Sequence, residues 1–283
     1  MSEKLDRGFH NKQGYLERMS KPLKEKMRAA EFIGDDARDI LDVGCANGVI
    51  TKGIAHRYPE ARVHGIDLDE EFISDAALPS DDDHAPEFER VYLREILERP
   101  RRYDAVTFMS VLHEFYSYGN REPSVMKAVA DAYELLNPGG KLVIRDMILP
   151  ERMKTAEFPA TSIANKIRAN AEVAGRLAEF EAMYGPIDTL YNANHFLLKY
   201  MYTENWEREL PENYVPVSGD QYRGLFDWLG ANTTHVESYL IPYLRDKWQE
   251  DFGLTEAEML NLYSTTILVT EKPQDALPMS PSK

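Results

Sequence analysis

Two glycines and an aspartate have the types and spacing of a ligand-binding turn. Gly44 and Gly48 bracket a short turn after the apolar stretch 39–43, and Asp67 follows the next apolar stretch, 62–66. Because glycine has no Cβ, a ligand can approach this backbone closely. A carboxylate at the end of the second strand can accept hydrogen bonds from both hydroxyls of a ribose. The arrangement predicts a site for an adenosine-type ligand.

The same turn also excludes some classes of nucleotide ligand. A dinucleotide site would carry the G-x-G-x-x-G pattern, but Ala46 and Val49 stand where two of its three glycines would be. The P-loop pattern, which ends in Gly-Lys and a serine or threonine, is also absent from the sequence. The ligand is therefore expected to lack a pyrophosphate.

These residues need a framework that brings the ends of several strands together. Short apolar stretches alternate with helical patterns over 39–149, and two more strands are expected at 233–243 and 264–271. This alternation predicts an α/β fold: a doubly wound, mostly parallel seven-stranded sheet with helices on both faces. A helical insertion is expected between the fifth and sixth strands, because about eighty residues after Pro150 lack a good strand pattern.

Several elements are predicted individually. One helix is expected at 14–33 and another at 160–183, the third strand at 88–93 and the fifth at 141–149. Ser218 with Gln221, and Thr255 with Glu258, have capping-box spacing. The expected organisation is an N-terminal helical cap (1–38), a core domain (39–149), a helical insertion over the substrate (150–232), C-terminal strands completing the sheet (233–272) and a disordered tail (273–283).

Four motifs in one order carry a family resemblance. Leu41-Asp-Val-Gly-Cys-Ala-Asn-Gly48 resembles the first motif of class I (Rossmann-like) S-adenosylmethionine-dependent methyltransferases, and Gly65-Ile-Asp67 resembles their second-strand acidic motif. The stretch 103–113 is similar to their fourth strand, and 136–144 to the turn into their fifth. The resemblance covers about 39–149, with two last strands extending it to about 271. It implies a transferase that binds S-adenosyl-L-methionine on the 39–149 core and performs methylation.

The resemblance also implies roles for particular residues. The methionine end of the cofactor would lie against the first motif, the ribose on Asp67 and the adenine on Leu68. The family often has an acidic residue after the third strand. Here the usual Asp is missing, and Glu95 is the substitute. The residues assigned to the cofactor are Asp42, Gly44, Cys45, Gly48, Asp67, Leu68, Glu95, Ser110 and Val111. Cys45 equally fits a small packing residue.

An oxygen nucleophile usually needs a base to accept its proton during methyl transfer. His113 follows the fourth strand, whose carboxyl end faces the expected site, and is the first candidate base. His195, in the insertion, is the second. Each histidine also fits a structural role, and Glu114 fits an exposed carboxylate at the start of a helix. No metal is expected, since no H-x-x-x-H or paired cysteine pattern occurs.

Composition bears on the partner and the location. The 283 residues carry a formal net charge of −15, which repels nucleic acid and anionic membranes at long range. A basic stretch at 1–28 fits a solvated helix face, or alternatively a local contact with an anionic substrate, which leaves nucleic acid open. No run approaches the roughly 18 apolar residues of a membrane span. The N-terminus is polar, and the single Cys45 allows no internal disulfide, so a cytoplasmic location is expected.

Three functions follow from these observations. The first is a methyltransferase acting on an O or N atom of a small molecule, which predicts a closed pocket under the insertion. The second is a methyltransferase acting on RNA or protein, which predicts an open cleft beside the basic residues of 1–28. The third is a non-catalytic module that keeps the fold for binding. The substrate and the oligomeric state are left open.

Overall fold

The computed structural model describes residues 23–78, 85–155 and 160–275. The strands are β1 (Asp39–Val43), β2 (Arg62–Asp67), β3 (Glu87–Arg90), β4 (Tyr103–Met109), β5 (Leu136–Asp146), β6 (Asn232–Tyr239) and β7 (Thr265–Glu271). Within the described residues they form one seven-stranded sheet in the order β3-β2-β1-β4-β5-β7-β6. The first five strands in this order, β3, β2, β1, β4 and β5, run parallel to one another, and β7 pairs antiparallel with both β5 and β6. The prediction of a mostly parallel, doubly wound α/β fold is confirmed.

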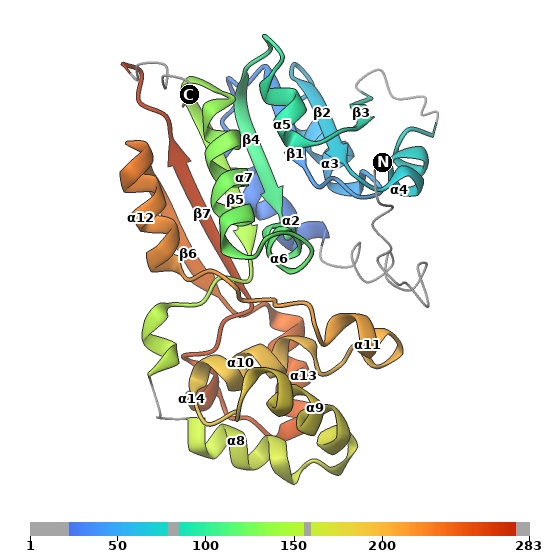
Figure 1. Cartoon of the computed structure of the whole chain (residues 1–283), viewed down its shortest axis with the longest axis vertical. Helices are drawn as coiled ribbons and strands as arrows, with labels where there is room; N and C mark the ends of the chain where they lie inside the picture. The colour runs from blue at the N-terminus through green and yellow to red at the C-terminus, as the bar shows by residue number, and fades with distance from the viewer. Residues whose placement is uncertain (1–22, 79–84, 156–159, 276–283) are drawn as a thin grey trace.

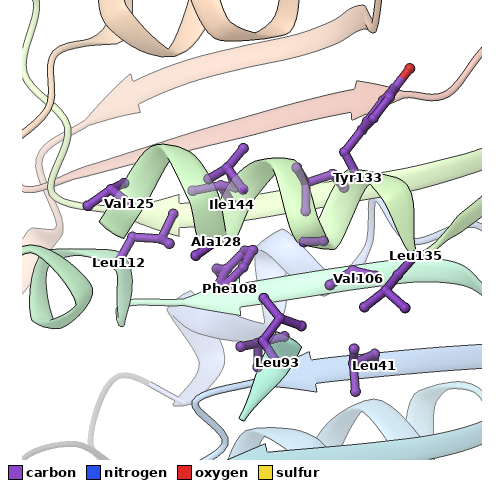
Figure 2. Packing of buried hydrophobic residues seen from close by; sticks show 14 of the residues in the cluster. Leu41, Leu93, Val106, Phe108, Leu112, Val125, Ala128, Tyr133, Leu135 and Ile144 are labelled. Atoms are coloured by element: carbon purple, nitrogen blue, oxygen red, sulfur yellow. The ribbon is translucent and has the colours of Figure 1, made fainter. Parts of the chain in front are cut away.

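Helices cover both faces of this sheet. The helices of the sheet domain are α2 (Leu23–Ala30), α3 (Val49–Arg57), α4 (Glu70–Ala76), α5 (Leu93–Leu97), α6 (Leu112–Ser117), α7 (Glu122–Glu134) and α12 (Gly219–Leu229), the last of which directly precedes β6. One buried cluster joins α5, α6, α7 and α12 to the sheet, and a second joins α2 and α3 to the opposite face. Figure 2 shows α7, through Val125 and Ala128, lying over Phe108 and Ile144 of the central strands.

A separate helical part lies beyond the carboxyl ends of β4 and β5 (Figure 1). It contains α8 (Ala160–Ala169), α9 (Ala174–Tyr184), α10 (Leu190–Lys199), α11 (Trp206–Glu209), α13 (Pro242–Phe252) and α14 (Glu256–Met259), with the short 3-10 turns Glu151–Lys154, Ala171–Val173 and Thr203–Asn205. A third buried cluster holds these helices together. Because α13 and α14 come from the β6–β7 connection, this helical part draws on more of the chain than 150–232.

Several element boundaries differ from expectation for local reasons. The third strand ends at Arg90 rather than residue 93, because α5 begins at Leu93. The sixth strand ends at Tyr239, since Pro242 is the first residue of α13. The helix expected at 160–183 is interrupted near Asn170, whose side chain accepts a hydrogen bond from the Glu172 N–H. The fifth strand begins at Leu136, so the expected turn 137–140 lies within it.

Both capping boxes are confirmed at the starts of α12 and α14. Some predicted features cannot be compared with the structure. Most of the basic stretch 1–28 and the first part of the helix expected at 14–33 lie outside the described residues, as do the end of the C-terminal tail and the acidic run 81–83. The described part of that helix, α2, ends at Ala30 rather than residue 33. No helix among the described residues is long and apolar enough to cross a membrane.

Candidate functional site

The turn after β1 is held in shape by the end of β2. The backbone N–H groups of Gly44 and Cys45 donate to the carbonyl of Ile66, at 2.8 and 3.0 Å. Gly44 and Gly48 have φ angles of 73° and 76°, a region that favours glycine. A Cβ on Gly44 would lie only 2.4 Å from Val111 Cγ2. The glycine therefore permits both the backbone bend and the close packing of the chain after β4.

Gly48 has a comparable reason to lack a side chain. A Cβ there would lie 2.5 Å from Phe88 Cζ on β3, which packs under the turn. Ala46, between the two glycines, also has a positive φ of 47°. Its N–H donates to Asp67 Oδ2 at 2.9 Å, and this bond helps to hold the strained residue.

Asp42 and Asp67 lie at the two strand ends that flank this turn. The Asp42 carboxylate is buried and accepts hydrogen bonds from the hydroxyls of Thr51 and Thr107, both at 2.7 Å. Burial raises the pKa of Asp42, while the two hydroxyls oppose that shift. Asp67 accepts from Ala46 N through Oδ2 and from Asp69 N through Oδ1. Asp67 therefore anchors the turn in addition to facing the ligand pocket.

Two neighbouring hollows surround this turn. The smaller has a volume of about 40 Å³. Its lining includes most of the residues assigned to the cofactor, namely Asp42, Gly44, Cys45, Asp67, Ser110 and Val111, but not Gly48. The larger, of about 260 Å³, is mostly apolar and is lined by Leu68, Val91, Tyr92, Val111 and Phe115 among others. Gly44, Asp67 and Val111 line both hollows, so the polar and apolar parts adjoin at these residues.

Gly48 does not line either hollow, although its neighbours Asn47 and Val49 line the smaller one, and neither does Glu95. It is exposed on the first turn of α5, where its Oε1 accepts a long hydrogen bond of 3.4 Å from Tyr92 N. The reason is the early end of β3 at Arg90, which puts Val91, Tyr92 and Leu93 against the apolar hollow instead. The sequence did not point to these three residues, because its pattern predicts a third strand that continues to residue 93.

A third cavity, of about 150 Å³, lies where the sheet meets the helical part. Its lining comes from α2, the ends of β4 and β5, α6, α10, α11 and the chain after it, α13 and the start of β7. The lining includes Lys26, Ser110, His113, Glu114, Arg145, Arg208, Glu209, Glu212 and Tyr214. Glu114 lines this cavity and both hollows near the β1 turn. The three spaces are therefore neighbours around one side chain.

Glu114 is more enclosed than the sequence suggested. It was expected to be an exposed carboxylate at the start of a helix, but its side chain is only 11% exposed. Arg208 Nη2 lies 3.8 Å from Glu114 Oε1. The cause is the helical part, which closes over α6 and could not be placed from sequence periodicity.

His113, the first candidate base, is clamped between two carboxylates. Its Nδ1 lies 2.8 Å from Asp146 Oδ1, and its Nε2 lies 3.1 Å from Glu212 Oε1. Asp146 Oδ2 also accepts from the N–H groups of Leu112 and His113, so it fixes the start of α6. Burial lowers the pKa of His113, but Asp146 and Glu212 outweigh it and hold the pKa well above its usual value. The two carboxylates therefore favour the charged, imidazolium form of the ring.

Glu212 belongs to a charged group that the sequence did not reveal. Its Oε2 lies 3.3 Å from Arg208 Nη1 and accepts a hydrogen bond of 3.3 Å from Tyr118 Oη. Arg208 also pairs with Glu209 at 2.8 Å, and Glu209 accepts from the Tyr214 hydroxyl. The spacing of Arg208, Glu209 and Glu212 in the chain matches no catalytic pattern. Only the three-dimensional structure brings them to His113.

His195, the second candidate base, lies in the core of the helical part and does not line the cavity. It is 1% exposed and makes edge contacts with the rings of Phe180 and Tyr184. Its Nε2 accepts a long hydrogen bond of 3.4 Å from Tyr214 N. Burial, and then the charge of Lys199, hold its pKa well below the usual value. The structure thus places a neutral packing histidine here, whose link to the cavity runs through Tyr214.

His113, Glu114 and Glu212 also have donor atoms within 4.8 Å of one another, close enough for a common metal ion. Their present partners do not favour one. The imidazole of His113 has both nitrogens engaged by carboxylates, and Arg208 already supplies positive charge to Glu212. The expectation of no metal stays a prediction.

Comparisons with known proteins agree with this geometry. A family model described as a methyltransferase domain matches residues 41–142. The ubiquinone biosynthesis O-methyltransferase of Leptothrix cholodnii is 35% identical over 113 residues, which are 37% of this chain and 42% of that protein. Its counterpart in Pseudomonas savastanoi pv. phaseolicola is 27% identical over 114 residues, which are 40% and 45% of the two chains. The matches thus span less than half of these relatives.

Solved structures extend the likeness of fold to most of the chain. A putative methyltransferase in complex with the Haloferax volcanii Trm112 methyltransferase activator aligns over 92% of this chain and 95% of its own, with a TM-score of 0.57 and 15% identity. The plantazolicin methyltransferase BpumL aligns over 92% and 88%, with a TM-score of 0.55 and 13% identity. The ordered motifs, the sheet and the domain match confirm the resemblance to the class I S-adenosylmethionine-dependent methyltransferases, and residues 41–142 form a methyltransferase domain.

Proposed function

We propose that this chain binds S-adenosyl-L-methionine around the β1 turn and transfers a methyl group to an O or N atom of a small molecule. The observation that carries the proposal is the arrangement of three neighbouring spaces around Glu114. Two of them adjoin the turn and Asp67, and the third lies under the helical part. A donor and an acceptor could therefore meet beside Glu114 while the helical part excludes water.

The residues around the turn fit the proposed cofactor. Gly44 leaves the backbone open where a Cβ would strike Val111, and Asp67 offers a carboxylate at the edge of both hollows. The apolar hollow, with Leu68 and Val91 in its lining, suits the flat face of an adenine. When bound, the cofactor would supply an electrophilic methyl group on a sulfonium.

His113 and Asp146 would manage the proton of an oxygen nucleophile. Asp146 holds Nδ1, so that Nε2 is directed toward Glu212 at the cavity wall. An acceptor hydroxyl that takes the place of the Glu212 carboxylate would remove one of the two anions that keep the ring protonated. Burial would then favour the neutral imidazole, whose Nε2 could accept the hydroxyl proton. In this proposal Glu212 keeps His113 charged until the acceptor enters.

The alternative acceptors are RNA and protein. The cavity is small, about 150 Å³, and most of its lining side chains are buried, which favours a small molecule. The net charge of −15 disfavours a polynucleotide. Names of curated relatives point the same way, since ubiquinone biosynthesis O-methyltransferases act in making a small molecule. A non-catalytic binding module would leave the His113, Asp146 and Glu212 arrangement without a role.

One labelling experiment tests the proposal. The purified chain is incubated with methyl-labelled S-adenosylmethionine in three separate reactions. The first contains a library of small phenols and amines, the second total RNA and the third a protein mixture. Label is expected in the small-molecule fraction. His113→Gln should reduce that label by roughly 100-fold or more, whereas the exposed His56→Gln should leave it unchanged. Label confined to RNA or protein, or none in any fraction, would overturn the proposal.

A further inference from the structure

One side of the third cavity is positively charged and has no carboxylate paired with it. Arg145, at the end of β5, is 5% exposed and lines the cavity. Its Nη1 donates to Ser110 Oγ at 2.5 Å and its Nη2 to Thr265 Oγ1 at 3.3 Å. Among the described residues it forms no ion pair, and its Nε has no hydrogen-bond partner. The guanidinium is thus held by hydroxyls alone.

Lys26 adds a second buried charge to the same side. It lies on α2, is 4% exposed and lines both the third cavity and the small hollow beside the β1 turn. Among the described residues it makes no direct hydrogen bond or ion pair, although the charges of Asp42, Asp146 and Glu114 favour its charged form and raise its pKa. Burial, and next the charge of Arg145, lower the pKa of Lys26 to about 8, so it remains mostly charged at neutral pH. We call Lys26 and Arg145 the cationic wall.

On the opposite side of the cavity, a buried cation does have carboxylate partners. Arg208 also lines the cavity and is buried, but it pairs with Glu209 at 2.8 Å and Glu212 at 3.3 Å. Buried charges are costly unless they are paired. A cation that lines a ligand cavity without a protein counter-ion indicates that the ligand supplies the negative charge.

We propose that the substrate carries a carboxylate, which binds the cationic wall and leaves its acceptor hydroxyl or amine toward His113 and Glu212. The proposal rests on the proposed function, because it assigns the third cavity to the substrate. A guanidinium matches the planar carboxylate well. Lys26 adds charge from the side facing the cofactor, and Thr265, already bonded to Arg145, lies in the same lining.

The amino-acid end of the cofactor also carries a carboxylate, so the experiment must separate the two sources. Lys26 lines both spaces, whereas Arg145 lines only the third cavity and not the hollow beside the turn. Arg145 is therefore the discriminating residue. If it serves the substrate, its replacement should weaken the binding of an acid without weakening that of S-adenosylhomocysteine.

The test uses acids and their neutral amides, matched in shape. Calorimetry on the chain saturated with S-adenosylhomocysteine compares salicylate with salicylamide, mandelate with mandelamide and glycolate with glycolamide. At least one acid should bind roughly tenfold or more tightly than its amide, as expected for a charged hydrogen bond. Arg145→Met should abolish this preference, and Arg145→Lys should keep part of it. Arg223→Met is the matched control, since Arg223 is exposed and pairs with Asp220 outside the cavity.

Each outcome bears on a separate claim. Equal binding of all acids and amides by the unaltered chain would overturn the carboxylate proposal, even if Arg145→Met fails to fold. Weaker S-adenosylhomocysteine binding in Arg145→Met, with the acid preference kept, would assign the cation to the cofactor and also overturn it. If the unaltered chain does not bind S-adenosylhomocysteine at all, the proposed function itself fails.

Discussion

Replacing Gly44 by alanine should damage both the stability of the turn and its affinity for the cofactor. The new Cβ would lie 2.4 Å from Val111 Cγ2, 3.0 Å from its Cβ and 3.1 Å from its Cγ1. The residue would also have to keep a φ of 73°. Either the turn or the chain after β4 must therefore move, and both line the proposed cofactor site.

The magnitude follows from these two contributions. A non-glycine residue in the left-handed region costs roughly 1–2 kcal/mol, and forcing a side chain into a packed site costs about 1–3 kcal/mol. Gly44→Ala should therefore lower the free energy of unfolding by about 2–5 kcal/mol. Val111→Ala in the same chain removes the contacts at 2.4 and 3.1 Å but not the backbone strain. The double variant should be less destabilised than the sum of the single variants by about 1–3 kcal/mol.

Urea unfolding and calorimetry with S-adenosylhomocysteine measure both effects. Gly175→Ala is the matched control, because a Cβ on Gly175 in α9 meets nothing within 4 Å and should stabilise the helix by about 0.5–1 kcal/mol. Affinity for S-adenosylhomocysteine should fall roughly tenfold or more in Gly44→Ala, a loss of about 1.4 kcal/mol. Additive single effects, or an affinity equal to that of the control, would refute the packing argument.

Three further predictions concern the cavity and the helical part. Burial lowers the pKa of His113, but Asp146 and Glu212 outweigh burial, so its folded pKa lies well above the unfolded value of about 6.5. Its stabilising contribution is complete below that value and is lost as pH rises through the folded pKa. Glu212→Gln should move this loss to lower pH, and a Tm profile with the same pH dependence as the unaltered chain would contradict the clamp. Lys199→Met should lower the free energy of unfolding by about 3 kcal/mol, because Lys199 Nζ donates to the carbonyls of Glu209, Leu210 and Glu212. The exposed Lys24→Met should change it by less than about 0.5 kcal/mol, and equal urea midpoints for the two variants would contradict this role. His195→Gln should cost about 2 kcal/mol of stability through lost packing yet leave S-adenosylhomocysteine affinity within about threefold, and a much larger loss in calorimetry would show that His195 reaches the cofactor.

The core of the fold was predictable because local patterns there follow the strand and helix periods. The first two strands and the fourth were placed nearly residue by residue, since each is a short apolar run that ends at a turn or a charged residue. The capping boxes before α12 and α14 were readable for the same reason, because their chemistry lies within four consecutive residues. The turn from Gly44 to Gly48 was predictable for the same reason, because its pattern lies within five consecutive residues.

The charged cavity could not be predicted, because its residues come from segments far apart in the chain. Its cations Lys26, Arg145 and Arg208 and the carboxylate of Glu212 come together only when α2, β5, α11 and the chain after α11 meet. Glu114 was interpreted as exposed for the same reason. Glu95 shows a different limit. The third strand was expected to end three residues later than it does, and the residues after its actual end, rather than Glu95, line the apolar hollow.

The most direct test of the account is a pair of calorimetric titrations on the unaltered chain, with S-adenosylhomocysteine and with NAD. We expect the sulfur nucleoside to bind and NAD to bind not at all. Asp67→Ala should weaken the first titration strongly, whereas Asp75→Ala on the exposed side of α4 should not alter it. Tight binding of NAD without binding of S-adenosylhomocysteine would contradict the assignment of the turn and everything inferred from it.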